Sequence, residues 1–106
     1  MADEIGASHI LLMHDGSPNS KATRTKEEAA EKIAGLKMEI DGGADFAELA
    51  RTHSDCSSAS SGGDLGMFGR GMMVPEFEAA AYGLEVGDVS DAVETDFGYH
   101  LIHRTG

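Results

Sequence analysis

The apolar positions of this chain fall into short clusters whose spacing changes from one segment to the next. The first cluster, residues 7–13 with the sequence ASHILLM, has the length of a β-strand. Side chains alternate across a strand, so His9, Leu11 and Met13 would share one face and Ile10 would lie on the other. Because apolar residues occupy both faces, we predict a central strand that is covered on both sides of its sheet.

Two amphipathic helices are predicted to follow a polar loop at residues 14–24. Thr25 and Glu28 form the capping-box pattern of a helix N-terminus, and the glycine pair at 42–43 ends that helix. Asp45 is the predicted N-cap of a second, shorter helix. The apolar stripes of the two helices are Ala29, Ile33, Leu36 and Ile40 in the first and Phe46, Leu49, Ala50 and His53 in the second.

The second half of the chain predicts further strands and one more helix. Residues 54–63 are small, polar and flexible in composition, yet the apolar segment after them makes a domain boundary implausible. The elements predicted beyond this segment are a strand at 64–68, a helix from Pro75 to Gly83, and strands at 89–95 and 99–104 that form a hairpin. The order β-α-α-β-α-β-β describes a single α+β domain over residues 1–106.

The stretch at 62–77, GGDLGMFGRGMMVPEF, combines apolar side chains with five glycines. A loop is normally polar, because exposed apolar surface and unpaired backbone groups both cost free energy. Glycines allow sharp turns and the close approach of another chain. The composition is compatible with the wall of a small hydrophobic pocket, but this stretch alone slightly favours a strand–turn–helix junction packed in the core.

Charge and cysteine content narrow the class of function. The chain of 106 residues carries 19 acidic and 8 basic residues, a net charge of −11. This charge disfavours nucleic acid, whose phosphates need clustered Lys and Arg, and it disfavours an anionic membrane surface. The one cysteine, Cys56, excludes an intramolecular disulfide and is typical of a reducing compartment. Because no secretory leader or transmembrane run is visible, we expect a cytoplasmic protein, unless the chain is a domain of a secreted parent.

The residues that could carry chemistry are few. The sequence contains no G-x-S-x-G, G-x-G-x-x-G or P-loop motif. The remaining candidates are His9 and His100 on strands, Cys56 after the second helix, and Thr95 near the hairpin. Each of these alone is more often a structural residue, and His53-x-x-Cys56 is only half of a zinc spacing, so no metal site is predicted. A thiol nucleophile paired with a histidine lacks any local cysteine-enzyme signature.

Four segments together resemble the parvulin family of peptidyl-prolyl cis/trans isomerases: ASHILL from Ala7, SDCSSASSGGDLGMFGRGMM from Ser54, VPEFEAAAY from Val74 and TDFGYHLIHR from Thr95. The resemblance implies a parvulin-like fold within the FKBP-like superfold. That fold has a four-stranded antiparallel sheet flanked by about four helices, in the order β-α-α-(short α)-β-α-β-β. The resemblance also implies a monomer that rotates X–Pro bonds of peptides or unfolded proteins without a cofactor or metal.

The resemblance assigns roles to individual residues. The positions that match the family's proline-binding pocket are Leu65, Met73 and Phe77, with Phe97 in the turn before the second histidine. The positions that match its polar network are the paired His9 and His100, the Cys-or-Asp position Cys56, and the pocket hydroxyl Thr95. We expect the histidines to order hydrogen bonds rather than act as acid and base, and covalent attack by the thiol is a weak interpretation. The residues interpreted as packing are Met67, Phe68 and Met72.

Substrate choice is indicated by the first strand and the loop after it. The family branch that acts on phospho-Ser/Thr-Pro carries a Lys late in this strand and neighbouring arginines in the loop. Here the strand position is Met13, and the loop lacks an arginine pair although Lys21 and Arg24 are present. Together with the net charge, this disfavours a dianionic phosphate. We predict an isomerase that is not phospho-specific and accepts apolar or basic residues before proline; a peptide-binding chaperone or adaptor module with little turnover is the alternative.

Overall fold

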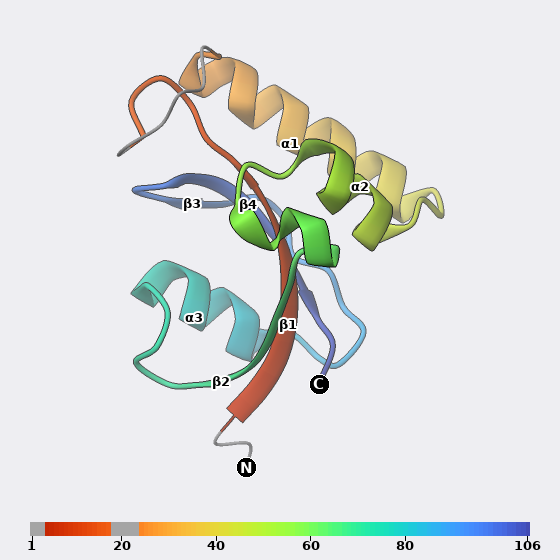
Figure 1. Ribbon diagram of the computed structural model, residues 1–106, viewed down its shortest axis with the longest axis vertical. Helices are drawn as coiled ribbons and strands as arrows, with labels where there is room; N and C mark the ends of the chain where they lie inside the picture. Colours follow the sequence, from red (N-terminus) through yellow and green to blue (C-terminus); the bar gives the residue numbers. More distant parts are fainter. Residues whose placement is uncertain (1–3, 18–23) are drawn as a thin grey trace.

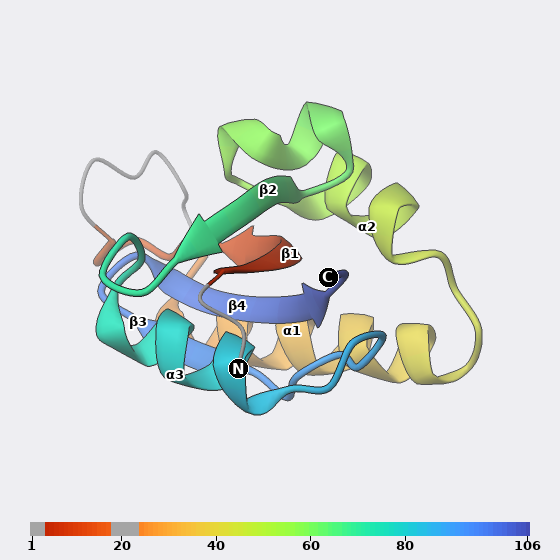
Figure 2. The same cartoon turned by 90° about the horizontal axis from the view of Figure 1, so that it is seen from below.

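A four-stranded antiparallel sheet forms the centre of the structure, a computed structural model that describes residues 4–17 and 24–106. The strands lie in the order β2-β1-β4-β3, and Figure 2 shows them in succession across the sheet. The strands are β1 (Glu4–Leu12), β2 (Asp64–Gly69), β3 (Val93–Thr95) and β4 (Gly98–Arg104). The helices are α1 (Lys26–Asp41), α2 (Phe46–His53) and α3 (Pro75–Gly83), with a short 3-10 helix, η1 (Ser57–Ser61).

Helices cover both faces of the sheet, which confirms the central strand predicted from the two-sided apolar pattern. In Figure 1, α1 and α2 lie together on one side of β1 and α3 lies on the other. The core on the α1 and α2 side consists of Ile10, Leu12, Ala29, Ile33, Leu36, Phe46, Ala50 and Leu101. The core on the α3 side consists of Ile5, Ala7, Phe68, Phe77, Ala81 and Ile102.

The predicted starts of the first two helices are confirmed by their caps. The Thr25 hydroxyl accepts the Glu28 N–H at 3.1 Å, and the Glu28 carboxylate accepts the Thr25 N–H at 2.8 Å. At α2, the Asp45 carboxylate accepts the Glu48 N–H at 3.1 Å. Both caps satisfy backbone donors that a helix leaves unpaired at its N-terminus, so the local sequence is sufficient to set these boundaries.

The first strand is displaced from its predicted bounds. β1 begins at Glu4 rather than Ala7 and ends at Leu12 rather than Met13. Beyond Leu12 the backbone leaves the sheet, because the Met13 N–H donates to the Asp55 carboxylate at 2.9 Å. A contact between segments far apart in the sequence therefore ends this strand.

The strand predicted at 89–95 is shorter in the structure, where β3 begins at Val93. The Ser90 N–H does donate to the carbonyl of Ile102 at 2.8 Å, as in a regular ladder. The return bond is different, because the Ile102 N–H donates to the Ser90 hydroxyl at 3.0 Å. Because a side-chain hydroxyl takes the place of the backbone acceptor, the regular ladder is interrupted here. Val89 pairs with His103 of β4 only as an isolated bridge.

The small polar segment after α2 contains η1, where the composition indicated flexibility. The segment ends at Gly63, whose φ of 83° lies in the left-handed region. A Cβ at this position would collide with the carbonyl oxygen of His9. The His9 N–H also donates to the Gly63 carbonyl at 2.9 Å, so the glycine allows the segment to join β1 at a residue of the predicted site.

Part of the predicted loop at 14–24, including Lys21, lies outside the described residues. Across the described ranges, none of the helices combines the length and the apolar character needed to cross a membrane.

Candidate active site

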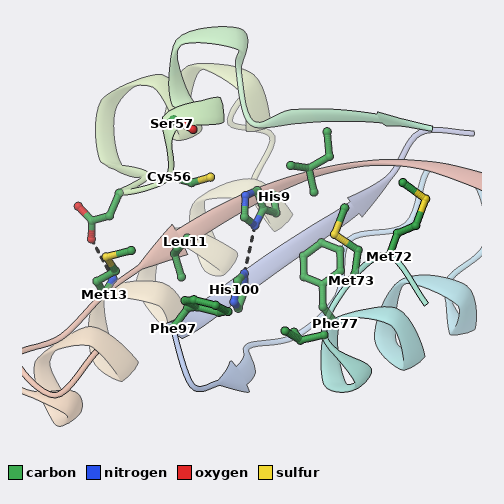
Figure 3. Close-up of a pocket in the computed structure, with 13 residues that line it drawn as sticks. His9, Leu11, Met13, Cys56, Ser57, Met72, Met73, Phe77, Phe97 and His100 are labelled. Carbon is green, nitrogen blue, oxygen red and sulfur yellow. Dashed lines mark hydrogen bonds between the residues drawn. The ribbon is translucent and has the colours of Figure 1, made fainter. Parts of the chain in front are cut away.

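A pocket of about 530 Å³ opens on the α3 side of the sheet (Figure 3). It is lined by residues from β1, the entry to η1, β2, the start of α3 and the β3–β4 hairpin: His9, Leu11, Met13, Asp55, Cys56, Ser57, Leu65, Met72, Met73, Val74, Phe77, Phe97 and His100. Every residue predicted for the site belongs to this lining except Thr95, which contacts His100. The structure therefore brings together residues that are far apart in the sequence.

His9 on β1 and His100 on β4 form the polar floor of the pocket. Their rings are stacked, with centroids 5.3 Å apart and planes 20° apart, and their Nδ1 atoms are 3.1 Å apart. On its other side, Nε2 of His100 is 2.8 Å from the Thr95 hydroxyl oxygen, which accepts the Phe97 N–H at 3.2 Å. The hairpin turn, the hydroxyl and both histidines thus form one continuous hydrogen-bonded chain.

Burial keeps both histidines uncharged near neutral pH. Desolvation lowers the pKa of His9 to about 4, and burial together with the neighbouring His9 lowers the pKa of His100 to about 3. Since each neutral imidazole carries one proton, the close Nδ1 pair forms a hydrogen bond only when one of the two atoms is protonated. The buried Nε2 atom of His9 has no hydrogen-bond partner among the described residues. The floor is therefore polar but carries no net charge.

Apolar side chains line the pocket beside the two histidines. The Phe77 ring from α3 meets both of them edge-on, with centroid distances of 5.5 Å to His9 and 5.4 Å to His100. Leu65 from β2 and Met73 from the segment before α3 also line the pocket and are half-buried. Apolar walls with a few placed polar groups are typical of pockets that bind small ligands.

Cys56 lies at the edge of the pocket, just before η1, and is half-buried as a free thiol. Its N–H donates to the Ser54 hydroxyl at 3.4 Å, and the same hydroxyl oxygen accepts the Leu11 N–H at 3.0 Å. These bonds tie the segment that carries Cys56 to β1. Within residues 4–17 and 24–106, no three His, Cys, Asp or Glu side chains are grouped so that they could hold a metal ion.

Cys56→Asp is expected to keep a substantial part of the isomerase activity that the family resemblance implies, with kcat/KM within about tenfold of the parent value. The reason is that rotation about an amide bond needs no nucleophile, so a carboxylate can replace the thiol as a polar neighbour of the pocket. The measurement is the isomerisation rate on a proline peptide, with Cys56→Ser as the control of similar size. Complete loss of activity in both variants, with a trapped covalent adduct in the parent chain, would contradict this prediction.

The rim of the pocket carries one acidic residue that is already paired. Asp55 accepts hydrogen bonds from the Arg24 guanidinium at 2.6 Å and from the Met13 N–H. Arg24 also donates to the Met13 carbonyl at 2.9 Å. Met13, the strand position from which substrate choice was predicted, itself lines the pocket. Over the described part of the chain, no Lys or Arg lines the pocket.

Several lining residues were not predicted as part of the site. The clearest case is Met72, which was interpreted as packing but lines the pocket and is 69% exposed. Met67 was also interpreted as packing and is 59% exposed, whereas Phe68 is buried as predicted. The apolar character of a methionine does not tell whether its side chain lies at the exposed rim of a pocket or in the buried core. Asp55 could have been found from its position next to Cys56.

The fold and the pocket define a small α+β domain with a largely apolar site above a neutral histidine pair. Comparison with known proteins identifies the family. The family model described as the PPIC-type PPIase domain matches residues 1–106. The chain is 49% identical over 114 residues to peptidyl-prolyl cis-trans isomerase Pin1 of Arabidopsis thaliana, covering 97% of this chain and 96% of that protein.

Two further relatives carry the same domain within longer chains. The foldase protein PrsA of a Geobacillus species is 50% identical over 103 residues, covering 96% of this chain but 32% of that protein. The structure of peptidyl-prolyl isomerase ESS1 from Candida albicans superimposes with a TM-score of 0.93 at 39% identity, covering 98% of this chain and 63% of that one.

The chain belongs to the family of PPIC-type PPIase domains. It is a parvulin-type peptidyl-prolyl cis–trans isomerase that acts on proline-containing peptides or proteins. The resemblance read from the sequence is confirmed, and so is the parvulin-like fold with its antiparallel sheet. The short helix expected after α2 is present as η1, of the 3-10 type.

Proposed function

We propose that this isomerase is not phospho-specific and accepts apolar or basic residues before proline. The observation that supports the proposal is the rim of the pocket. A phosphate dianion is bound by free Arg or Lys side chains. Here the rim presents the thioether of Met13 and the carboxylate of Asp55, and Arg24 is already paired with that carboxylate. An apolar side chain could contact Met13, and a basic one would be attracted by the acidic surface.

We propose that the pocket catalyses rotation by holding the proline ring while the preceding carbonyl swings. The barrier to rotation is about 18–20 kcal/mol, because twisting the bond breaks amide resonance. Leu65, Met73 and Phe77 are the side chains proposed to grip the ring. A site of low polarity favours the twisted amide, whose charge separation is reduced, over the planar one. Each 1.4 kcal/mol of preferential binding to the twisted form is worth about tenfold in rate.

We propose a positioning role for His9 and His100 rather than proton transfer. A general acid or base works best when its pKa lies near the operating pH, whereas burial lowers the pKa values of this pair to about 4 and about 3. Their hydrogen bonds to each other and to Thr95 would hold β1, β4 and the hairpin turn at a fixed separation beneath the ring. Phe97, at the tip of that turn, would contact the substrate from the open side of the pocket.

The proposal is tested with three peptides that differ only in the residue before proline. We expect kcat/KM for Leu-Pro and Arg-Pro to exceed that for phosphoserine-Pro by about tenfold or more, which corresponds to about 1.4 kcal/mol. The measurement is an exchange experiment by NMR, with Met13→Lys as the matched variant. That variant adds a cation at the rim and should narrow the difference between the peptides. A clear preference of the parent chain for phosphoserine-Pro would overturn the proposal.

We also propose that the chain acts as a monomer in a reducing compartment such as the cytoplasm. The net charge of −11 opposes self-association, and the single thiol at the pocket edge suits reducing conditions. A dimer mass by light scattering would contradict the first part, and recovery of the protein from an oxidising compartment would contradict the second.

A further inference from the structure

The segment between β2 and α3, residues 70–74, forms one side of the pocket and carries both Met72 and Met73 (Figure 3). At the head of this segment the chain turns at Gly71, whose φ of 85° is left-handed. An added Cβ at Gly71 would meet no atom within 4 Å, so the chain stands in open space at this point. Packing therefore does little to fix the turn, although Met73 must be held for the pocket to keep its shape.

Polar contacts with α3 supply the missing restraint. The Gly71 N–H donates to the carboxylate of Glu78, and the Arg70 guanidinium lies 4.1 Å above the centre of the Tyr82 ring. Glu78 and Tyr82 are four residues apart on α3, so they share one face of the helix. Phe77 lies next to Glu78 and projects into the pocket, so the same turn of α3 carries both a lining side chain and the anchor for the 70–74 segment.

We propose that Glu78 is a positioning residue for the isomerase reaction. Its carboxylate holds the Gly71 turn, and through that turn it keeps Met73 in contact with the ring of the bound proline. Glu78 is half-buried and is not among the lining residues, so its effect on substrate must pass through the segment that it holds. The inference rests on the proposed grip of Met73 on the proline ring, and it does not depend on which residue precedes proline.

Glu78→Ala is expected to raise KM about fivefold and to leave kcat within about twofold of the parent value. Loss of the hydrogen bond that ties the Gly71 turn to α3 lowers the population of the binding-competent arrangement, and the apparent affinity falls by the same factor. Since the wall contacts the ring in both the planar and the twisted states, the change falls on KM. The measurement is kcat and KM by NMR exchange, on the peptide that the parent chain isomerises fastest.

Two matched variants separate positioning from a general effect on charge or helix stability. Glu78→Gln keeps an oxygen acceptor for the Gly71 N–H and should restore KM to within about twofold of the parent value. Glu76→Ala removes a charge from the same first turn of α3 at an exposed position outside the pocket, and its KM should not change. If Glu78→Gln behaves like Glu78→Ala, or if Glu76→Ala raises KM equally, the inference is overturned.

A double-mutant cycle with Met73→Ala tests the route of the effect. If Glu78 acts through Met73, then Glu78→Ala should raise KM by less than about twofold when Met73 is already truncated. Additive effects of the two substitutions would overturn this route. If the proposed substrate preference is wrong, only the peptide used in the assay changes. If the effects of the two substitutions are additive on a peptide that the parent chain isomerises, the inference about Glu78 is contradicted.

Discussion

Phe77→Ala is expected to destabilise the fold by about 3–5 kcal/mol, the range observed for truncation of buried aromatic side chains. The ring is 3% exposed, packs against Phe68 with centroids 6.1 Å apart, and meets both pocket histidines edge-on. Because the new cavity would open onto the pocket, water can enter it, and we expect the lower half of the range. The midpoint of thermal unfolding should fall by about 10–20 °C.

The same substitution should lower kcat/KM by about 100-fold, because the lost contact with the proline ring is worth about 2–3 kcal/mol. Activity is measured well below the unfolding midpoint of each variant. Leu84→Ala is the matched control, since it truncates a half-buried residue of the same core that does not line the pocket. Phe77→Leu should fold and retain intermediate activity. Equal losses of activity in Leu84→Ala and Phe77→Ala would show that stability, not the pocket, accounts for the effect.

The parts of the fold that follow from local physics were predicted correctly. The capping box of Thr25 and Glu28 satisfies backbone donors within the same turn, so its signal is complete in the local sequence. The apolar residues on both faces of the segment around Ile10 likewise correspond to burial of β1 on both sides of the sheet. Boundaries set by distant segments could not be predicted in this way. Examples are the end of β1, set by Asp55, and the start of β3, set by the Ser90 hydroxyl.

The site was predicted from the family resemblance and not from the composition of the residues. A histidine on a strand has no local mark that distinguishes a buried, neutral pair from a surface residue. The pairing of β1 with β4 is what places His9 and His100 on one face, and that register is a tertiary property. Met72 is a case in which an apolar residue was predicted to be buried and is exposed. It lies in the segment between β2 and α3, on the surface of the protein.

Acidification from pH 7 to pH 5 is expected to lower the free energy of unfolding by about 4 kcal/mol through the histidine pair alone. His9 and His100 have pKa values lowered from 6.5 to about 4 and about 3 in the folded chain. As the pH falls through 6.5, the unfolded chain therefore gains protons that the folded chain does not bind. Each group contributes up to about 1.4 kcal/mol per pH unit, so stability is full above pH 6.5 and is lost on the acid side.

The prediction is checked by denaturant unfolding at pH 7 and at pH 5, where exposed carboxylates remain largely ionised. His100→Leu should show about half the pH-dependent loss, since one of the two groups is gone. Ring resonances followed by NMR report the same property directly, because the pair should stay neutral at pH 5.5. A titration midpoint near pH 6.5 for either ring would mean that water reaches the histidine pair. The site would then not have the low polarity that is proposed to favour the twisted amide.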